Sequence, residues 1–209
     1  MKKLIFGLIA IVFVLSLTAC NNIKTKTNII SETQLTDREK VFLSAGNNQY
    51  FVFNFSVDDT YKWVKVWVER YEFGGKASNS SELSAALSEN KEGMILAEVS
   101  GFEKMKNNWT IVIDNGGATS IAESSQEYKT VEDTSYSKVW GTNNSKDISI
   151  NDNEILLSSI CYEYINKSNS ISSLTDEFYN NPDENINEIA NYDLVYLLKC
   201  KFYKNIPSK

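Results

Sequence analysis

Apolar residues recur at every second position over much of the chain after residue 49, which is the period of a β-strand with one buried face. Residues 50 to 57 and 61 to 73 are dense in aromatic and β-branched side chains, and only Asp58, Asp59 and Thr60 separate them. This spacing predicts a β-hairpin. Further strands are predicted at 94 to 100, 109 to 113, 118 to 122, 155 to 165 and 192 to 202, with the Asn115-Gly116 pair forming a tight turn before the third of these.

Helical signals are short and scattered between the predicted strands. Thr36 with Glu39 forms a capping box that predicts a helix over residues 37 to 45. Similar caps at residues 79 to 82 and 181 to 184 predict two more short helices. Residues 124 to 153 are polar and predict a long loop with at most one edge strand. The expected fold is β-dominated α+β, an antiparallel sheet or β-sandwich with a few short peripheral helices.

The first twenty residues have the order of an export signal. Lys2 and Lys3 precede an apolar run from Leu4 to Leu15, which is too short for the roughly 20 residues of a membrane-spanning helix. The following Leu-Thr-Ala-Cys segment, residues 17 to 20, resembles the lipobox of bacterial lipoprotein precursors. The resemblance implies cleavage after residue 19, acyl chains on Cys20 and an extracytoplasmic, membrane-anchored protein.

The expected organisation follows from that cleavage. Residues 1 to 19 are the signal peptide, residues 20 to 35 are the lipidated N-terminus with a flexible polar tether, and residues 36 to 209 form one extracytoplasmic domain. The domain resembles other bacterial lipoproteins, and this resemblance implies no activity.

The net charge bears on possible partners. Loss of Lys2 and Lys3 leaves 19 basic against 27 acidic residues, a net charge of −8. Because binding to nucleic acid or to anionic headgroups requires a basic face, neither is an expected partner.

One face of the strand predicted at 61 to 73 is the candidate binding site. Val64, Val66 and Val68 alternate with aromatic residues that share the other face, namely Tyr61, Trp63, Trp67 and Tyr71. Two interpretations stand. These rings support a second layer of the fold, or they form an open surface for a glycan, a peptide or a partner protein.

The two cysteines that remain after lipidation also allow two interpretations. Cys161 and Cys200 fall in the two late strands, and export permits disulfides. They form a cross-strand bridge if the strands are neighbours in register, or they are two buried thiols.

The absence of histidine restricts the kinds of catalytic and metal site that the protein can hold. It removes Ser-His-Asp and Cys-His catalysis and the usual zinc sites, and we expect neither a cofactor nor a metal centre. Asp147, Ser149, Asn151 and Asp152 match the start of an EF-hand loop, but residues 152 and 158 lack its glycine and its glutamate. A weaker calcium site near 147 to 153 stays open.

These observations predict a non-enzymatic, lipid-anchored binding or interaction module that contacts its partner through the aromatic face. An immunity-type or structural lipoprotein that occupies a partner protein is one alternative. A cell-envelope hydrolase that uses carboxylates is another, because 27 acidic residues leave room for the pair that it needs.

Overall fold

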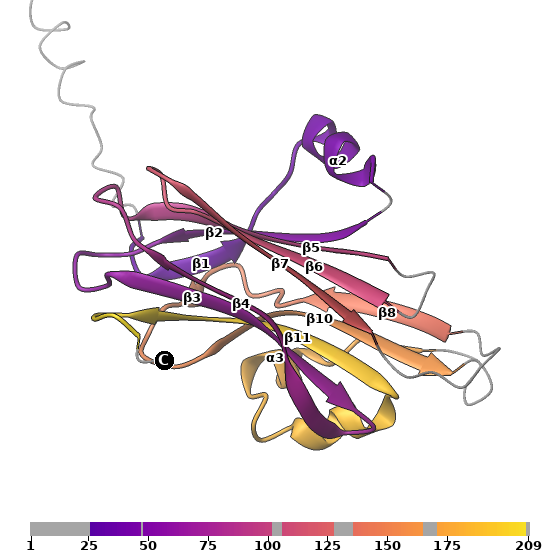
Figure 1. The fold of residues 1–209 in the computed structure, drawn as a ribbon. Helices are drawn as coiled ribbons and strands as arrows, with labels where there is room; N and C mark the ends of the chain where they lie inside the picture. The colour runs from indigo at the N-terminus through magenta and orange to yellow at the C-terminus, as the bar shows by residue number, and fades with distance from the viewer. Residues whose placement is uncertain (1–25, 47, 102–105, 128–135, 165–170, 208–209) are drawn as a thin grey trace, which may run out of the picture.

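A computed structural model describes residues 26–46, 48–101, 106–127, 136–164 and 171–207. Its strands form two antiparallel sheets that lie face to face (Figure 1). The expected β-dominated fold with a few short helices is confirmed, and it takes the form of a β-sandwich.

The two sheets differ in their strands and order. The six-stranded sheet, called sheet A, has the order β7 (Thr119–Glu127), β6 (Lys106–Asp114), β5 (Glu92–Ser100), β2 (Gln49–Ser56), β1 (Ile29–Glu32) and β9 (Ile148–Ser149). The five-stranded sheet, called sheet B, has the order β4 (Gly75–Ala86), β3 (Trp63–Glu72), β11 (Leu194–Tyr203), β10 (Ile155–Tyr164) and β8 (Tyr136–Thr142).

The main core lies between the sheets. Strand alternation brings Val64, Val66 and Val68 of β3 to the inner face, where they are cross-strand partners of Phe202, Cys200 and Leu198 in β11. Alternate residues of sheet A complete this core from the other side: Phe51, Phe53, Phe55, Ile95, Ala97, Val99, Trp109, Ile111 and Ile113. The interdigitation of two apolar inner faces explains why the two sheets stay together.

A second, smaller core covers the outer face of sheet B. It is formed by α3 (Asp176–Asn180), by the 3₁₀ helix η1 (Ile186–Asn191) and by outward-facing residues of β10 and β11. Phe178 and Ile189 are fully buried there. The central strands β10 and β11 of sheet B are therefore buried on both faces.

The helix α2 (Asp37–Ser44) stands apart from the sandwich (Figure 1). Its Thr36–Glu39 capping box is present as predicted, but it buries no residue and Val41 and Phe42 are exposed. No helix within the described ranges is long and apolar enough to cross a membrane.

The predicted hairpin of residues 50 to 57 with 61 to 73 is wrong. β2 belongs to sheet A and β3 to sheet B, so residues 57 to 62 cross between the layers. Asp58 holds this crossing, because its side chain accepts hydrogen bonds from Thr60 and from the amide of Asn28 at 2.7 Å. Both strands bury one face in the same core, which periodicity alone cannot distinguish from pairing within one sheet.

Two further elements differ from prediction. Residues 79 to 82 lie in β4, which pairs with β3 along its length. The helix was predicted because Leu83, Ala86 and Leu87 have helical spacing, but Leu83, Ala85 and Leu87 fit the period of a strand equally well. The predicted long loop of residues 124 to 153 contains the end of β7 as well as β8 and β9. Edge strands carry many polar residues, which hides them in the sequence.

The tether predicted for residues 20 to 35 is too long. Residues 29 to 32 form β1, which pairs with β2 and β9, and Ile30 is 0% exposed. Asn28 donates to Asp58 and accepts from its backbone N–H at 2.9 Å, which fastens the start of β1. The ordered domain thus begins before residue 36.

This assignment predicts that Ile30→Ala lowers the free energy of unfolding by about 2 to 5 kcal/mol, because it leaves a cavity in the main core. Ile206→Ala is the matched control, since Ile206 is 74% exposed and its truncation should change stability by about 0.5 kcal/mol or less. Urea unfolding of both variants measures the difference. Equal stability of the two variants would show that residue 30 lies in a tether.

Candidate functional site

The aromatic face predicted as an open contact surface is mostly inside the protein. Tyr61, Trp67 and Tyr71 are buried, and Trp63 is half-buried. Tyr61 packs edge-on against Phe202 in the main core, and Tyr71 joins the smaller core under η1. The site prediction is wrong, because Tyr61 lies in the main core, Tyr71 lies under the segment that contains α3 and η1, and Trp67 donates a hydrogen bond to the buried Glu69.

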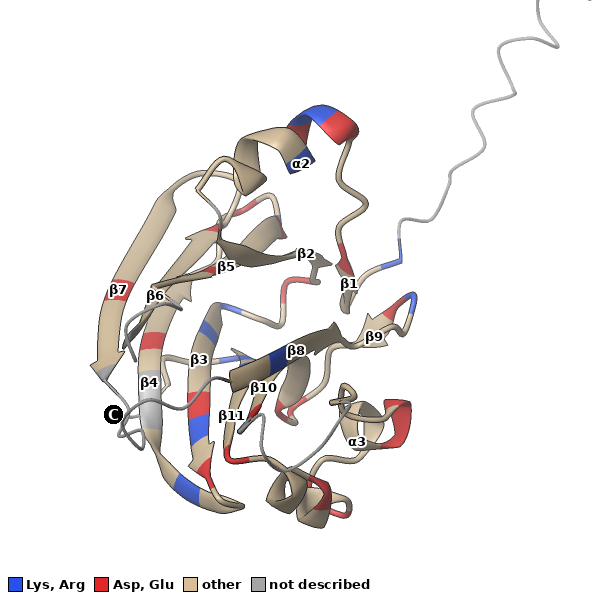
Figure 2. Ribbon diagram, turned by 90° about the vertical axis from the view of Figure 1, so that its right-hand side faces the viewer, with Lys and Arg blue, Asp and Glu red and all other residues tan. Residues whose placement is uncertain are grey.

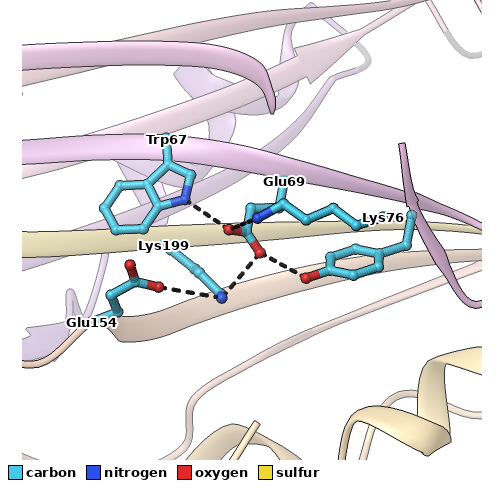
Figure 3. A network of polar contacts seen from close by, with 6 residues as sticks. Trp67, Glu69, Lys76, Glu154 and Lys199 are labelled. Carbon is cyan, nitrogen blue, oxygen red and sulfur yellow. Dashed lines mark hydrogen bonds and ion pairs between the residues drawn. The ribbon is translucent and has the colours of Figure 1, made fainter. Parts of the chain in front are cut away.

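A buried carboxylate replaces the expected open surface (Figure 3). Glu69 of β3 is 4% exposed and receives hydrogen bonds from Trp67 Nε1 at 3.3 Å and Tyr71 OH at 2.9 Å. Two ammonium groups also contact it, Lys76 Nζ at 2.5 Å and Lys199 Nζ at 3.0 Å. Strands β3, β4 and β11 are joined through this one side chain.

The network keeps Glu69 ionised. Burial alone would raise the pKa of Glu69, but the hydrogen bond from Lys76, the charge and hydrogen bond of Lys199 and the bond from Tyr71 outweigh it. The pKa falls from 4.5 to about 2. A carboxyl group with so low a pKa is a poor general acid at neutral pH, which favours a structural role for Glu69.

Lys199 also lines a cavity of about 450 Å³ between sheet B and the segment that follows α3. Its Nζ lies 3.5 Å from Glu154 in addition to its contact with Glu69. Because two carboxylates already flank this ammonium group, the cavity wall carries no unmatched positive charge at that point.

A larger groove lies where the edge of sheet B meets the uncovered end of β2. Its volume is about 590 Å³, and its walls come from β1, β2, β8 and the first turn of α3. Figure 2 shows β8 beside β1 and β9, with α3 on the other side of β8. Trp140 of β8 lines the groove and is 46% exposed.

Aromatic rings and carboxylates meet in this groove. Tyr50 and Tyr179 line it together with Trp140, and Glu32 and Asp176 supply the two carboxylates. The Thr142 hydroxyl donates to Glu32 at 2.9 Å, and the amide of Asn144 donates to Asp176 at 3.5 Å. A concave site with exposed aromatic surface and converging polar groups is the usual form of a ligand-binding site.

Sequence reasoning missed this groove. Its residues are spread from position 32 to position 179 and come from four separate segments. The one signal was Trp140, an aromatic residue in the polar stretch that had been predicted as a loop. An isolated tryptophan in such a stretch is a candidate for exposure.

The Asp/Asn-rich stretch near residues 147 to 153 forms ion pairs. Asp147 lies 2.7 Å from Lys26, and Asp152 lies 2.9 Å from Lys204. Across the described residues there is no group of three or more acidic or cysteine side chains arranged to hold a metal ion.

A comparison with known protein families identifies the family of the chain. The family model described as the YgaN domain matches residues 29–202, from the start of β1 almost to the end of β11. The chain belongs to the YgaN domain family. No curated protein and no solved structure matches it. The YgaN domain thus includes β1, in agreement with the buried position of Ile30, and contains all of the groove.

The two cysteines of the YgaN domain are both free and buried. β10 and β11 are neighbours, but Cys161 is the partner of Val195 whereas Cys200 is the partner of Ile155. Cys200 belongs to the main core and Cys161 to the smaller core, on opposite faces of sheet B. Of the two interpretations, a pair of buried thiols is confirmed and the cross-strand bridge is wrong. Burial raises the pKa of Cys161 to about 12, so its thiol is protonated and unreactive at neutral pH.

The Glu69 network predicts a specific loss of stability. Glu69→Gln leaves the buried ammonium group of Lys199 with Glu154 at 3.5 Å in place of two carboxylates, and should lower the free energy of unfolding by about 3 kcal/mol at pH 7. Glu177→Gln removes an exposed carboxylate from α3 and serves as the control. Urea titrations at pH 7 measure both, and equal effects of the two substitutions would contradict the network's role.

The same network predicts a pH dependence. Because the folded-state pKa of Glu69 lies below its unfolded value, its contribution is complete above about pH 4.5 and is lost as the pH falls towards 2. The stability difference between the wild type and Glu69→Gln should therefore shrink over that range, by on the order of 3 kcal/mol. A constant difference from pH 6 to pH 2 would contradict the low pKa.

Proposed function

We propose that this protein is a lipid-anchored, extracytoplasmic binding module that holds its ligand in the groove beside Trp140. The observation that carries the proposal is the half-exposed indole of Trp140 at the wall of a groove of about 590 Å³. Large aromatic side chains with both an apolar ring and a polar N–H are favoured contact residues in binding sites.

The export and anchoring part of the proposal rests on the sequence of residues 1 to 20, which lie outside the described residues. Cys20 would carry the lipid, and only residues 21 to 28 separate it from β1. Eight residues span at most about 30 Å even when fully extended. The domain would therefore act close to the membrane surface, on a partner that is also held there or that reaches it.

The groove supports a binding role better than the previously favoured aromatic face of residues 61 to 73. The rings of Trp67 and Tyr71 are already in contact with Glu69 and are buried. Trp140 has almost half of its surface open to solvent, so a ligand can cover it without any rearrangement of the cores. The contact residues that we now propose are Trp140, Tyr50, Glu32 and Asp176.

A carboxylate-dependent envelope hydrolase is the second candidate. It is favoured by one observation, that Glu32 and Asp176 both line a groove that also presents aromatic rings. Glycosidases use such a pair of carboxyl groups on either side of the scissile bond. Release of reducing ends from purified peptidoglycan by the wild type, lost in Glu32→Gln, would favour this candidate over a binding module.

The anchor predicts that Cys20 is the only site of lipid attachment. In bacteria that express the full chain, an alkyne-tagged fatty acid should label the wild type and should not label Cys20→Ala. The Cys20→Ala protein should also leave the membrane fraction. An unlabelled wild-type protein would contradict the anchoring.

The groove predicts that binding depends on Trp140. Whatever co-purifies with the wild type from detergent-solubilised membranes should be reduced at least tenfold by Trp140→Ala. Ile121→Ala is the matched control, because Ile121 is a large exposed side chain on β7, outside the groove. A partner that is retained by Trp140→Ala and lost with Ile121→Ala would move the site to sheet A.

A further inference from the structure

The groove is bordered by strand edges with a free side. Among the described residues, β8 is the last strand of sheet B and pairs only with β10. β1 covers Phe53 to Ser56 of β2, because the chain turns away after the hydrogen bond from the Thr33 N–H to the Val52 carbonyl. Within the same described part of the chain, residues 49 to 51 of β2 therefore have a strand partner on one side only, which is β5.

Free strand edges are binding sites for extended polypeptides. Their backbone N–H and C=O groups offer a ladder of hydrogen bonds to any segment that lies alongside, as in strand addition to PDZ domains. Three consecutive residues of β8, from Trp140 to Thr142, line the groove, as do three consecutive residues of β2, from Gln49 to Phe51. A glycan has no regular backbone ladder to match these edges.

The charge of the groove selects among polypeptides. Glu32 and Asp176 line it, and no lysine or arginine does. In the part of the chain that the structure describes, neither carboxylate lies within 4.0 Å of a lysine or arginine nitrogen. A cleft lined by charges of one sign attracts ligands of the opposite sign.

The exposed ring adds a second feature that suits a cation. Lys138 Nζ lies 5.7 Å from the centroid of the Trp140 ring, so this indole holds an ammonium group of the protein on one face, and a ligand cation would have to contact the other face. Tryptophan is the best aromatic partner for such contacts. Glu32 and Asp176, which line the same groove, would neutralise a cation that reached Trp140 from a ligand.

A second depression adjoins the groove. It has a volume of about 540 Å³ and shares Glu32 and Asn144 with the first. Together they form an elongated site beside the end of β1 and the end of β8, which suits an extended ligand better than a compact one.

We propose that the groove binds an extended polypeptide segment that carries a lysine or arginine side chain. The segment lies along the edge of β8 at residues 140 to 142, and its cation contacts Trp140 and one of the two groove carboxylates, Glu32 or Asp176. This inference rests on the proposed function, because it assigns the ligand of the same groove.

The test uses the full lipidated protein in neutral detergent and a defined probe. The probe is a blocked seven-residue peptide of alternating valine and lysine, compared with the same peptide containing glutamate in place of lysine, and with a neutral tetramer of N-acetylglucosamine. Isothermal titration should give binding only for the lysine peptide, and the affinity should fall as the salt concentration rises.

Two further arms separate the charge from the strand edge. Glu32→Gln combined with Asp176→Asn should weaken the lysine peptide at least tenfold. Asp183→Asn combined with Glu184→Gln removes the same charge outside the groove and should leave the affinity unchanged. A lysine peptide that is methylated on alternate backbone nitrogens should also bind with at least tenfold lower affinity, and this measurement requires no change in the protein.

Each outcome decides between the two proposals. If the lysine peptide shows no binding at 1 mM, the polypeptide inference is wrong, whereas the proposed function is still judged by the Trp140-dependent partner. If only the neutral glycan binds and Trp140→Ala abolishes it, the groove is the site and the ligand class is wrong. Binding of the lysine peptide that is insensitive to both the carboxylate variant and backbone methylation also overturns the inference.

Discussion

The fold depends on one constraint, which is that the centre of sheet B must be covered on both faces. β11 is buried at nearly every position, so neither of its faces can be left to solvent. Sheet A covers the inner face, and the segment that contains α3 and η1 covers the outer face. An antiparallel sheet more often has one solvated face, so this double burial is the reason that an aromatic strand face is not a surface here.

Glu69 shows what this double cover demands of a charged residue. Glu69 lies between Trp67 and Tyr71 on the outer face of β3. Its cross-strand partner in β11 is Leu197, and Lys199 is the cross-strand partner of Trp67. A carboxylate at 4% exposure would be costly alone, and it is tolerated because two ammonium groups and two further donors surround it. The outer face of β3, which was predicted to be a contact surface, instead joins three strands through the contacts of Glu69 with Lys76 and Lys199. The binding site that we propose therefore lies at an edge of the sandwich and not on this strand face.

The sequence predicts local features well and the arrangement of layers poorly. The capping box at Thr36 and the turn at Asn115 and Gly116 are found as predicted, because each depends on neighbouring residues. The assignment of β2 and β3 to different sheets, and of residues 75 to 86 to a strand, depends on which distant strands they pair with. The groove could not be predicted, since Glu32, Trp140 and Asp176 meet only in the folded chain.

The central claim is that the protein meets its partner at the groove and not at the aromatic face or on α2. Site-specific photo-crosslinking in intact bacteria tests it directly, with the photoreactive residue placed in turn at Tyr50, Trp140, Phe42 and Ile121. Partner binding at the groove should give strong crosslinked products from positions 50 and 140 and none from positions 42 and 121. Products from position 42 or 121 alone would contradict it.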